Sequence, residues 1–293
     1  MPETVACNLC GIADGVPQPW KARFLRIPQP FGIYRCRRCG LTYQNPRPTP
    51  SELAAIYATH PYYSTANVTR GEPRQRFYAS RMERLERRRP QRGTMLGMGC
   101  LDGGYALEVA QRRGWRVSAI EFSPILAAHA REQLGVEVEV AEAWDLSSVA
   151  GRRFDVIYSR SLEHFLDPRA TLRHCWKLVA HEGLLMLDVP NTFHSLKDKI
   201  KRPIVALMGS KAIPSSHGEF PSEVHTYYFD PRTIRRLLEG ERFEVLELRT
   251  YLPHNPVYLA NPRLRWLQEL LYAVGGLFDR GPSIEVIARP VRW

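Results

Sequence analysis

The sequence predicts an α/β fold, in which helices cover both faces of a mostly parallel sheet, with a small metal-binding module in front of it. Two observations indicate this. From residue 94 onward, short apolar runs typical of strands alternate with amphipathic segments typical of helices, and such alternation builds parallel sheets. Before that point, two Cys-x-x-Cys pairs are separated by residues 11–35, a pattern typical of zinc sites.

The metal-binding module is predicted from four cysteines, which are Cys7, Cys10, Cys36 and Cys39. Thiolates in two such pairs can converge tetrahedrally on one Zn²⁺. The long stretch between the pairs indicates a zinc ribbon with an elaborated hairpin. A disulfide interpretation is weaker, because no secretory signal precedes the cysteines. Four sulfur ligands leave no open position for a substrate, so we expect a structural metal.

Seven strands and six helices are expected in order along the chain. The strands are expected at residues 94–98, 115–121, 136–140, 154–159, 184–189, 243–249 and 284–288. The helices are expected at residues 52–58, 73–89, 103–113, 124–134, 168–180 and 231–239. Three helices begin with a capping residue followed by proline, at Ser123-Pro124, Asp167-Pro168 and Asp230-Pro231. The cap side chain accepts a first-turn N–H, and proline at the first helical position has no N–H that needs an acceptor.

The expected domains are a zinc-ribbon module at residues 1–50, a helical linker at 51–92 and the sheet domain at 93–293. Two long insertions interrupt the sheet domain, at residues 191–228 and 251–282. Long connections on the carboxyl side of a parallel sheet usually shape a substrate pocket. The second insertion carries an apolar helical stripe of Trp266, Leu267, Leu270, Leu271 and Val274. We expect the stripe to pack on the sheet or on the second subunit of a homodimer; a lid over an apolar substrate is the alternative.

The formal net charge of +11 is unevenly placed. Residues 70–92 contain nine arginines against three glutamates, and Tyr78, Met82 and Leu85 form an apolar stripe among them. Such a basic amphipathic helix can attract nucleic acid. We favour a docked helix with a solvated arginine face, because no aromatic stacking platform is interleaved with the arginines.

The length of the apolar runs and the two cysteines outside the pairs indicate the cellular location of the protein. The apolar runs are too short to span a bilayer, so no membrane span is expected. Cys100 and Cys175 lie outside the two cysteine pairs, and two unpaired thiols fit a reducing cytoplasm. We therefore expect a soluble, cytoplasmic protein.

A glycine-rich turn follows the first strand of the sheet, with glycines at residues 97, 99, 103 and 104. Glycines there let the backbone approach a ligand at the carboxyl edge of the sheet, although a tight turn without a ligand is the alternative. The next strand ends in Glu121. An acidic residue about 20 positions after such a turn typically accepts hydrogen bonds from a ribose diol. Glu142 follows the third strand and is placed to face an adenine.

The order of the motifs resembles class I S-adenosylmethionine-dependent methyltransferases. The motifs are Met95-Leu-Gly-Met-Gly-Cys-Leu-Asp-Gly-Gly104, Glu121-Phe-Ser-Pro124, Ser161-Leu-Glu-His-Phe-Leu-Asp-Pro168, Gly183-Leu-Leu-Met-Leu-Asp-Val-Pro190 and His225-Thr-Tyr-Tyr-Phe-Asp-Pro231. The cysteine module followed by Asn45-Pro-Arg-Pro48 is similar to a bacterial subgroup with a zinc-ribbon head. That subgroup is typically linked to secondary-metabolite and surface-glycan biosynthesis. The resemblance implies a Rossmann-like seven-stranded sheet.

The resemblance also implies S-adenosylmethionine as the cofactor. The residues that it assigns to cofactor binding are Gly97, Gly99, Gly103, Glu121, Phe122, Glu142 and Ala143. The glycines would line the methionine side, Glu121 would hold the ribose hydroxyls, and Glu142 with Ala143 would contact the adenine. The chain departs from the family pattern at Gly97, where an acidic residue is usual, and at Leu101, where glycine is usual. Asp102 can compensate for the missing carboxylate.

His164 and His225 are the candidate catalytic residues. Methyl transfer needs a base that takes a proton from the acceptor, and histidine titrates near neutrality. The structural alternatives are that His164 bonds backbone at the start of a helix and that His225 fixes its loop onto a neighbouring tyrosine. Weaker candidates are Glu163, His217 and Glu219.

The predicted function is S-adenosylmethionine-dependent methyl transfer to an oxygen or carbon atom of a small biosynthetic intermediate, such as a secondary metabolite or a sugar. An RNA base methyltransferase is one alternative, because zinc ribbons also occur on such enzymes and the chain is basic. A non-catalytic Rossmann scaffold, whose cofactor site has decayed at Gly97 and Leu101, is another.

Overall fold

The computed structural model describes residues 2–25, 27–59, 72–99, 104–141, 145–196, 198–200, 224–252 and 265–292. It divides into two compact units. The first unit consists of Met1–Ala54, Val189–Leu237 and Leu248–Glu285, and the second of Ala55–Asp188, Leu238–Glu247 and Val286–Trp293. The predicted boundaries at residues 50 and 92 differ from this division, because two later segments join the N-terminal residues in the first unit.

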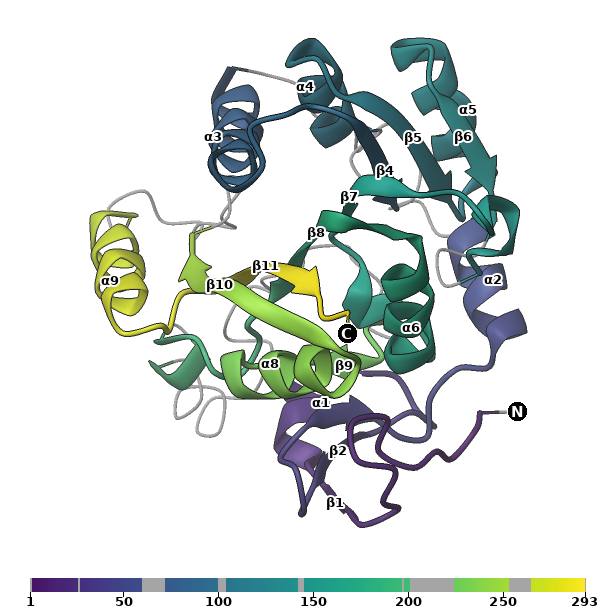
Figure 1. Ribbon diagram of the computed structural model, residues 1–293. Coiled ribbons are helices and arrows are strands. Elements are labelled where there is room, and N and C mark those ends of the chain that lie inside the picture. The colour runs from purple at the N-terminus through teal and green to yellow at the C-terminus, as the bar shows by residue number, and fades with distance from the viewer. Residues whose placement is uncertain are drawn as a thin grey trace. The chain divides into compact units, whose positions relative to one another are not determined.

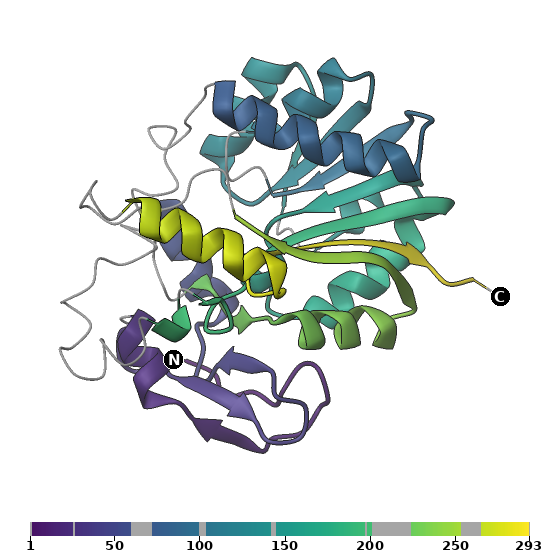
Figure 2. The same ribbon diagram turned by 90° about the vertical axis from the view of Figure 1, so that its left-hand side faces the viewer.

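The first unit contains a small antiparallel sheet with the strand order β1-β2-β3-β9 (Figure 2). Its strands are β1 (Gly15–Pro17), β2 (Ile33–Cys36), β3 (Thr42–Gln44) and β9 (Tyr227–Tyr228), and helix α1 (Pro19–Leu25) follows β1. Strand β9 pairs with β3, with Thr42 opposite Tyr228. A small core of Ile27, Ile33, Phe193 and Tyr228 covers one side of this sheet. The hairpin of β2 and β3 is the expected ribbon, whereas its fourth strand comes from far along the chain.

A seven-stranded sheet has the order β10-β11-β8-β7-β4-β5-β6 (Figure 1). Its strands are β4 (Thr94–Met98), β5 (Arg116–Glu121), β6 (Glu137–Val140), β7 (Phe154–Ser159), β8 (Val179–Pro190), β10 (Phe243–Tyr251) and β11 (Ser283–Pro290). Parallel pairing joins β4 to β5 and β7, β5 to β6, and β7 to β8. The predicted Rossmann-like, mostly parallel sheet of seven strands is therefore confirmed.

The helices confirm the predicted order, with small shifts at their ends. They are α2 (Pro50–Thr59), α3 (Glu72–Arg88), α4 (Tyr105–Arg112), α5 (Pro124–Leu134), α6 (Pro168–Leu178), α8 (Pro231–Gly240) and α9 (Arg265–Leu277), with short 3₁₀ helices η3 (Ser147–Val149) and η4 (Leu162–His164). The predicted caps form, since Ser123 Oγ accepts from Leu126 N at 3.3 Å and Asp167 Oδ1 accepts from Ala170 N at 2.9 Å. The expected extension of α6 to residue 180 is wrong, because Val179 already pairs with β7.

Helices cover both faces of the large sheet. The main core lies on one face, where Met95 of β4 packs with residues of α3, α4 and α5. Successive side chains of a strand point to opposite faces, and Met98 accordingly lies on the other face. There its Sδ lies 3.6 Å from Sγ of Cys175 on α6. Burial raises the pKa of Cys175 to about 12, so this cysteine is a thiol in the core, as the apolar pattern predicts.

Helix α3 is a docked amphipathic helix, as predicted, with Tyr78, Met82 and Leu85 buried in the core. The expectation of a solvated arginine face is wrong in part. Arg81 is 1% exposed, and Arg84 and Arg89 form ion pairs with carboxylates of the same unit. Several arginines therefore dock the helix and do not face solvent.

Only part of the apolar stripe of α9 is shielded from solvent. Trp266 is 64% exposed and Leu270 is 51% exposed, whereas Leu271 and Val274 are half-buried. The expectation of packing on the sheet is therefore wrong for the first two residues, because the helix turns them toward solvent. Packing on a second subunit stays a prediction. Within the described ranges, none of the helices has the length and apolar character that crossing a bilayer requires.

Candidate functional site

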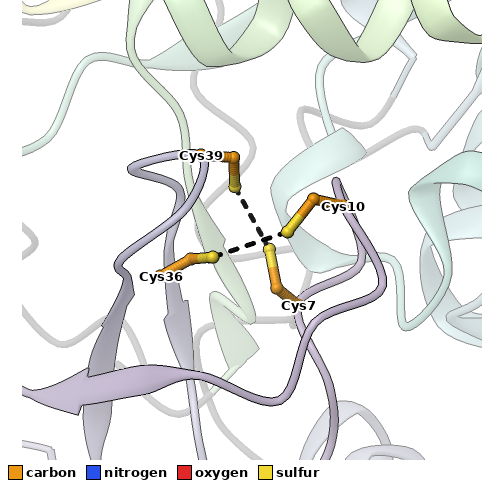
Figure 3. A group of neighbouring side chains, drawn as sticks. All are labelled: Cys7, Cys10, Cys36 and Cys39. Carbon is orange, nitrogen blue, oxygen red and sulfur yellow. Dashed lines mark hydrogen bonds between the residues drawn. The ribbon is translucent and has the colours of Figure 1, made fainter.

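The four cysteines of the first unit lie on two matching turns (Figure 3). In each turn, the N–H of the glycine after the second cysteine donates to the carbonyl of the first: Gly11 to Cys7 at 2.7 Å and Gly40 to Cys36 at 3.0 Å. The two glycines have φ of 74° and 81°, in the left-handed region that favours glycine. Gly11 follows Cys10 as Gly40 follows Cys39, so the two turns match in sequence as well as in conformation.

The cysteine cluster, formed by Cys7, Cys10, Cys36 and Cys39, fits a zinc ion. All four Sγ atoms lie within 4.8 Å of one another, and Figure 3 shows them pointing toward a common centre. Sγ of Cys7 lies 3.4 Å from Sγ of Cys39, and Sγ of Cys10 lies 3.5 Å from Sγ of Cys36. Sulfurs held at a zinc–sulfur distance of about 2.3 Å in a tetrahedron lie about 3.8 Å apart. The geometry is therefore close to that of a Cys₄ site.

The pKa shifts of the cysteines also favour binding of a cation. A hydrogen bond from Cys7 lowers the pKa of Cys39 to about 5. The same hydrogen bond, together with burial, raises the pKa of Cys7. In the absence of a cation, ionisation of one thiol thus opposes ionisation of its neighbour. A divalent cation removes this conflict, since all four groups can then bind as thiolates.

The second unit contains the point at which the strand order of the large sheet reverses. The chain moves from β4 outward to β5 and β6, and β7 then returns to the other side of β4. Open α/β sheets bind ligands outside the carboxyl ends of their strands at such a point. Here Ser159 Oγ donates to Met98 O at 3.1 Å and accepts from Ser161 N at 3.2 Å. These bonds fix the ends of β4 and β7 beside each other.

Three of the four glycines of the predicted turn are described: Gly104 has φ of 80°, and a Cβ on Gly97 or on Gly99 would come closer than 3.0 Å to a neighbouring side chain. Gly99 has φ of +88°, and a Cβ on it would lie 2.6 Å from Ser161 Oγ. A Cβ on Gly97 would lie 2.8 Å from Cδ2 of Leu107. The buried Leu107 thus occupies the space in which an acidic side chain at position 97 would begin. Gly103 lies outside the described residues, as do Leu101 and Asp102.

Glu121, the predicted ribose ligand, ends β5 on the same edge of the sheet. Its side chain is buried, and Oε1 accepts from Ser123 N at 2.8 Å. The preceding residue, Ile120, accepts from Gly99 N at 2.8 Å. A fixed carboxylate beside bare backbone suits a ribose diol. Glu142 and Ala143 lie outside the described residues.

Tyr57 lies beside two of the predicted residues, Phe122 and His164. The rings of Tyr57 and Phe122 are 4.8 Å apart. The Tyr57 hydroxyl lies 2.9 Å from Nδ1 of His164. Tyr57 precedes both in the chain by more than 60 residues, and no local motif marks it. Its role was therefore missed by the sequence prediction, and only the tertiary structure brings it to this edge.

Glu163 and His164 form a buried pair on η4, directly after β7. His164 Nε2 lies 3.7 Å from Glu163 Oε1. Burial lowers the pKa of His164 to about 3, so the imidazole is neutral. Burial raises the pKa of Glu163 to about 8, so that its proton exchanges near neutral pH. Of this pair, Glu163 has the pKa better suited to acid–base chemistry.

His225 lies in the first unit, immediately before β9. It is 6% exposed, and its ring centroid lies 6.3 Å from that of Tyr228, nearly perpendicular to it. This contact agrees with the structural alternative, in which His225 fixes its loop onto a tyrosine. Its catalytic role stays a prediction. His217 and Glu219 lie outside the described residues.

Comparison with known proteins adds a family and several relatives. The sequence model of a family described as "Methyltransferase domain" matches residues 71–248. A ubiquinone biosynthesis O-methyltransferase of Caulobacter sp. (strain K31) is 30% identical over 160 residues, an alignment that covers 52% of this chain and 59% of the relative. The chain thus spans less than two thirds of that relative's length.

Two solved structures share the fold at low sequence identity. One is the 1,6-didemethyltoxoflavin-N1-methyltransferase of Burkholderia thailandensis, solved with 1,6-didemethyltoxoflavin and S-adenosylhomocysteine. Its TM-score is 0.54 and its sequence identity is 16%, and the match covers 91% of this chain and 98% of that protein. The other is the magnesium protoporphyrin IX methyltransferase of Synechocystis PCC 6803, solved with bound SAH. Its TM-score is 0.55 and its sequence identity is 12%, and the match covers 83% of this chain and 100% of that protein. At this identity, the likeness shows a common architecture.

Proposed function

We propose, since this chain belongs to the methyltransferase domain family, that it transfers the methyl group of S-adenosylmethionine to a small molecule. The observation that carries the proposal is the edge of the large sheet at β4 and β5. There the bare backbone at Gly99 donates to Ile120, and the next residue of β5 is the buried Glu121. This is the position at which open α/β sheets bind nucleotide-like ligands.

The residues at this edge fit the cofactor. Gly99 leaves room only for backbone, and Glu121 is held by Ser123 so that it can accept from ribose hydroxyls. Phe122 and Tyr57 supply an aromatic wall beside them. When bound, S-adenosylmethionine supplies an electrophilic methyl group. The protein then has to align the acceptor atom and take its proton, and a positioned base contributes roughly 10²–10⁴-fold in rate.

Glu163 is the proposed base of the second unit, with His164 and Tyr57 orienting it. The pKa of about 8 lets Glu163 exchange a proton near neutral pH. His164, with a pKa of about 3, acts in this proposal through its contact with Glu163. His225 remains the candidate base of the first unit.

Oxygen is the favoured acceptor atom. The Caulobacter relative is named an O-methyltransferase of ubiquinone biosynthesis. We therefore propose an oxygen on a small biosynthetic intermediate, with carbon as the alternative. RNA is less favoured, because Arg81, Arg84 and Arg89 of the basic helix pair with carboxylates of their own unit.

The test is calorimetric titration of the full chain with S-adenosylhomocysteine. We expect one binding site, and we expect Glu121→Ala to weaken binding by about 1.5–3 kcal/mol, the usual loss for hydrogen bonds to a charged group. Glu137→Ala is the matched control, because Glu137 lies on β6 and pairs with Arg152 at the surface. Absence of binding by the unmodified protein would overturn the proposal. An unchanged affinity in Glu121→Ala would overturn the ribose assignment.

A further inference from the structure

Helix α9 of the first unit has one apolar face that is exposed. Trp266, Leu270, Ala273 and Leu277 follow one another at intervals of four, three and four residues, so they share one side of the helix. All four are exposed, and Leu277 is exposed at 82%. Phe278, directly after the helix, is exposed at 70%. Large apolar side chains that gather on one exposed face usually mark an interaction surface.

The opposite side of α9 is packed within its own unit. Gly275 is buried there, and a Cβ on it would lie 2.9 Å from the carbonyl oxygen of Arg280 and 3.5 Å from Cβ of Leu196. Leu196 N donates to the same carbonyl oxygen at 2.9 Å. The turn after α9 is thus hydrogen-bonded to the segment that contains Leu196. The unit therefore presents the apolar face outward on a helix whose C-terminal end is fixed.

Basic residues are concentrated in α9 with its flanks and in the segment that holds its end. Residues 197–202, directly after Leu196, contain four cations and one carboxylate, and residues 263–280 contain three arginines and two carboxylates. The two stretches together have a net charge of +4. Lys199 and Ile200 lie within about one helical turn of Leu196, and both are exposed. Exposed cations and exposed apolar side chains therefore occur together in this part of the unit.

We propose that the exposed face of α9 docks on the surface of a membrane that contains anionic lipid. Helices that lie in a membrane interface combine Trp, Phe and Leu on one side with Lys and Arg beside them. Trp266 near the start of α9 and Phe278 after its end suit the headgroup level, where aromatic rings are enriched. The basic residues are attracted by the negative surface potential of anionic lipids. Docking of this kind requires no helix that crosses the bilayer, and it goes beyond the proposed function.

A second copy of the chain is the weaker occupant of this face. The exposed parts of its four large side chains, which are Trp266, Leu270, Leu277 and Phe278, amount to roughly 500 Å² if each full side chain has about 150–250 Å². A stable interface buries about 800 Å² on each partner. Two copies would also bring two positively charged regions together, and like charges repel. An anionic lipid surface has the opposite sign, so it fits both the apolar face and the charge beside it.

The first experiment measures sedimentation of the full chain with lipid vesicles. Vesicles of phosphatidylcholine alone are compared with vesicles of equal parts of phosphatidylcholine and phosphatidylglycerol. We expect the unmodified protein to bind the mixed vesicles much more tightly. We expect this binding to weaken as sodium chloride is added, because salt screens exposed charges. No binding to the mixed vesicles, or equal binding to both kinds, would overturn the proposal.

The second experiment repeats the measurement with the double variant Trp266→Gln, Leu277→Gln. Both positions are exposed, so the melting temperature should hardly change, whereas the partition coefficient on mixed vesicles should fall about tenfold or more. Lys199→Gln should lower it about fivefold, the usual effect of one basic residue near an anionic surface. Ile125→Gln is the matched control, because Ile125 is 53% exposed on α5 of the other unit, and it should bind like the unmodified protein. Undiminished binding by the double variant would show that α9 is not the docking face.

Sedimentation velocity without vesicles tests the other occupants of the face. If a second copy covers it, the unmodified chain is a dimer and the double variant is a monomer, and this result would overturn the proposal. If another segment of the same chain covers it, the unmodified chain is a monomer that does not bind the mixed vesicles, and the proposal fails as well. Calorimetry with S-adenosylhomocysteine tests the proposed function separately, and the double variant should keep the affinity of the unmodified protein. Vesicle binding without cofactor binding would overturn the proposed function and support membrane docking.

Discussion

The cysteine cluster of the first unit and the arginine–aspartate cluster of the second unit, formed by Arg81, Arg160 and Asp188, are two polar sites of different character. In the first, four sulfurs that bind as anions surround a space that fits a cation. In the second, two guanidinium groups share one oxygen of Asp188. The first site therefore fits a cation, whereas the second already pairs side chains of opposite charge.

The two sites differ in how they are assembled. Each half of the cysteine cluster is a five-residue turn closed by its own backbone hydrogen bond, whereas the members of the second site come from α3, β7 and β8. Metal binding supplies much of the folding free energy of a small ribbon, whereas the ion pairs of the second site join elements of a packed core. Loss of the metal should consequently unfold its surroundings, whereas loss of an ion pair in the second site should only lower the stability of its unit.

The largest effect is expected for removal of the metal. Structural zinc contributes an apparent free energy of about 10–16 kcal/mol at pH 7 in small zinc modules. Cys36→Ser, or a strong chelator, should release the metal and expose the amides of β2 and β3 to hydrogen exchange, while β4 and β5 stay protected. Cys175→Ser is the control, because Cys175 lies in the other unit, and it should keep its metal. Full metal content in Cys36→Ser would contradict the Cys₄ assignment.

A smaller effect is expected for Asp188→Asn. Breaking a buried ion pair from one side typically destabilises a protein by about 3–5 kcal/mol, and this variant deprives both Arg81 and Arg160 of the shared carboxylate. Urea unfolding should show the loss. Glu244→Gln removes the partner of Arg289 in a pair whose side chains are 48% and 56% exposed, and it should cost about 0–1 kcal/mol. Equal losses in the two variants would show that the Asp188 pair stabilises no more than a surface pair.

The last expected effect is a pH dependence that arises at Glu163, a buried carboxyl of the second unit. Its folded pKa of about 8 lies above the ordinary value of 4.5, so between these values the folded state binds more protons than the unfolded state. The stability that Glu163 contributes is present below pH 4.5 and is lost as the pH rises toward 8. Unfolding measured across this range should show Glu163→Gln gaining on the unmodified protein by at most about 1.4 kcal/mol per pH unit. A difference that does not change with pH would place the carboxyl in contact with solvent.

Local patterns in the sequence were enough for most of the fold. The cap-and-proline starts of α5 and α6 form as predicted, because the cap bonds involve residues three positions apart. The ribbon hairpin and the parallel direction of most strands were also predicted from short segments of the sequence. The fourth strand of the ribbon sheet, β9, was not predicted, since two residues have no pattern of their own and pair with β3 only through the tertiary fold. The end of α6 at Leu178 likewise depends on the pairing of Val179 with β7.

The same distinction applies to the sites. The sequence by itself determined the four metal ligands and the carboxylate at the end of β5, because spacing along a turn or a strand fixes where those side chains lie. Only the tertiary structure brought Tyr57 to His164 and set Arg81 and Arg160 on one oxygen of Asp188. Such contacts join segments far apart in the chain. They depend on how α3 and the strands pack together, and burial at that packing then sets the pKa values of Glu163 and His164.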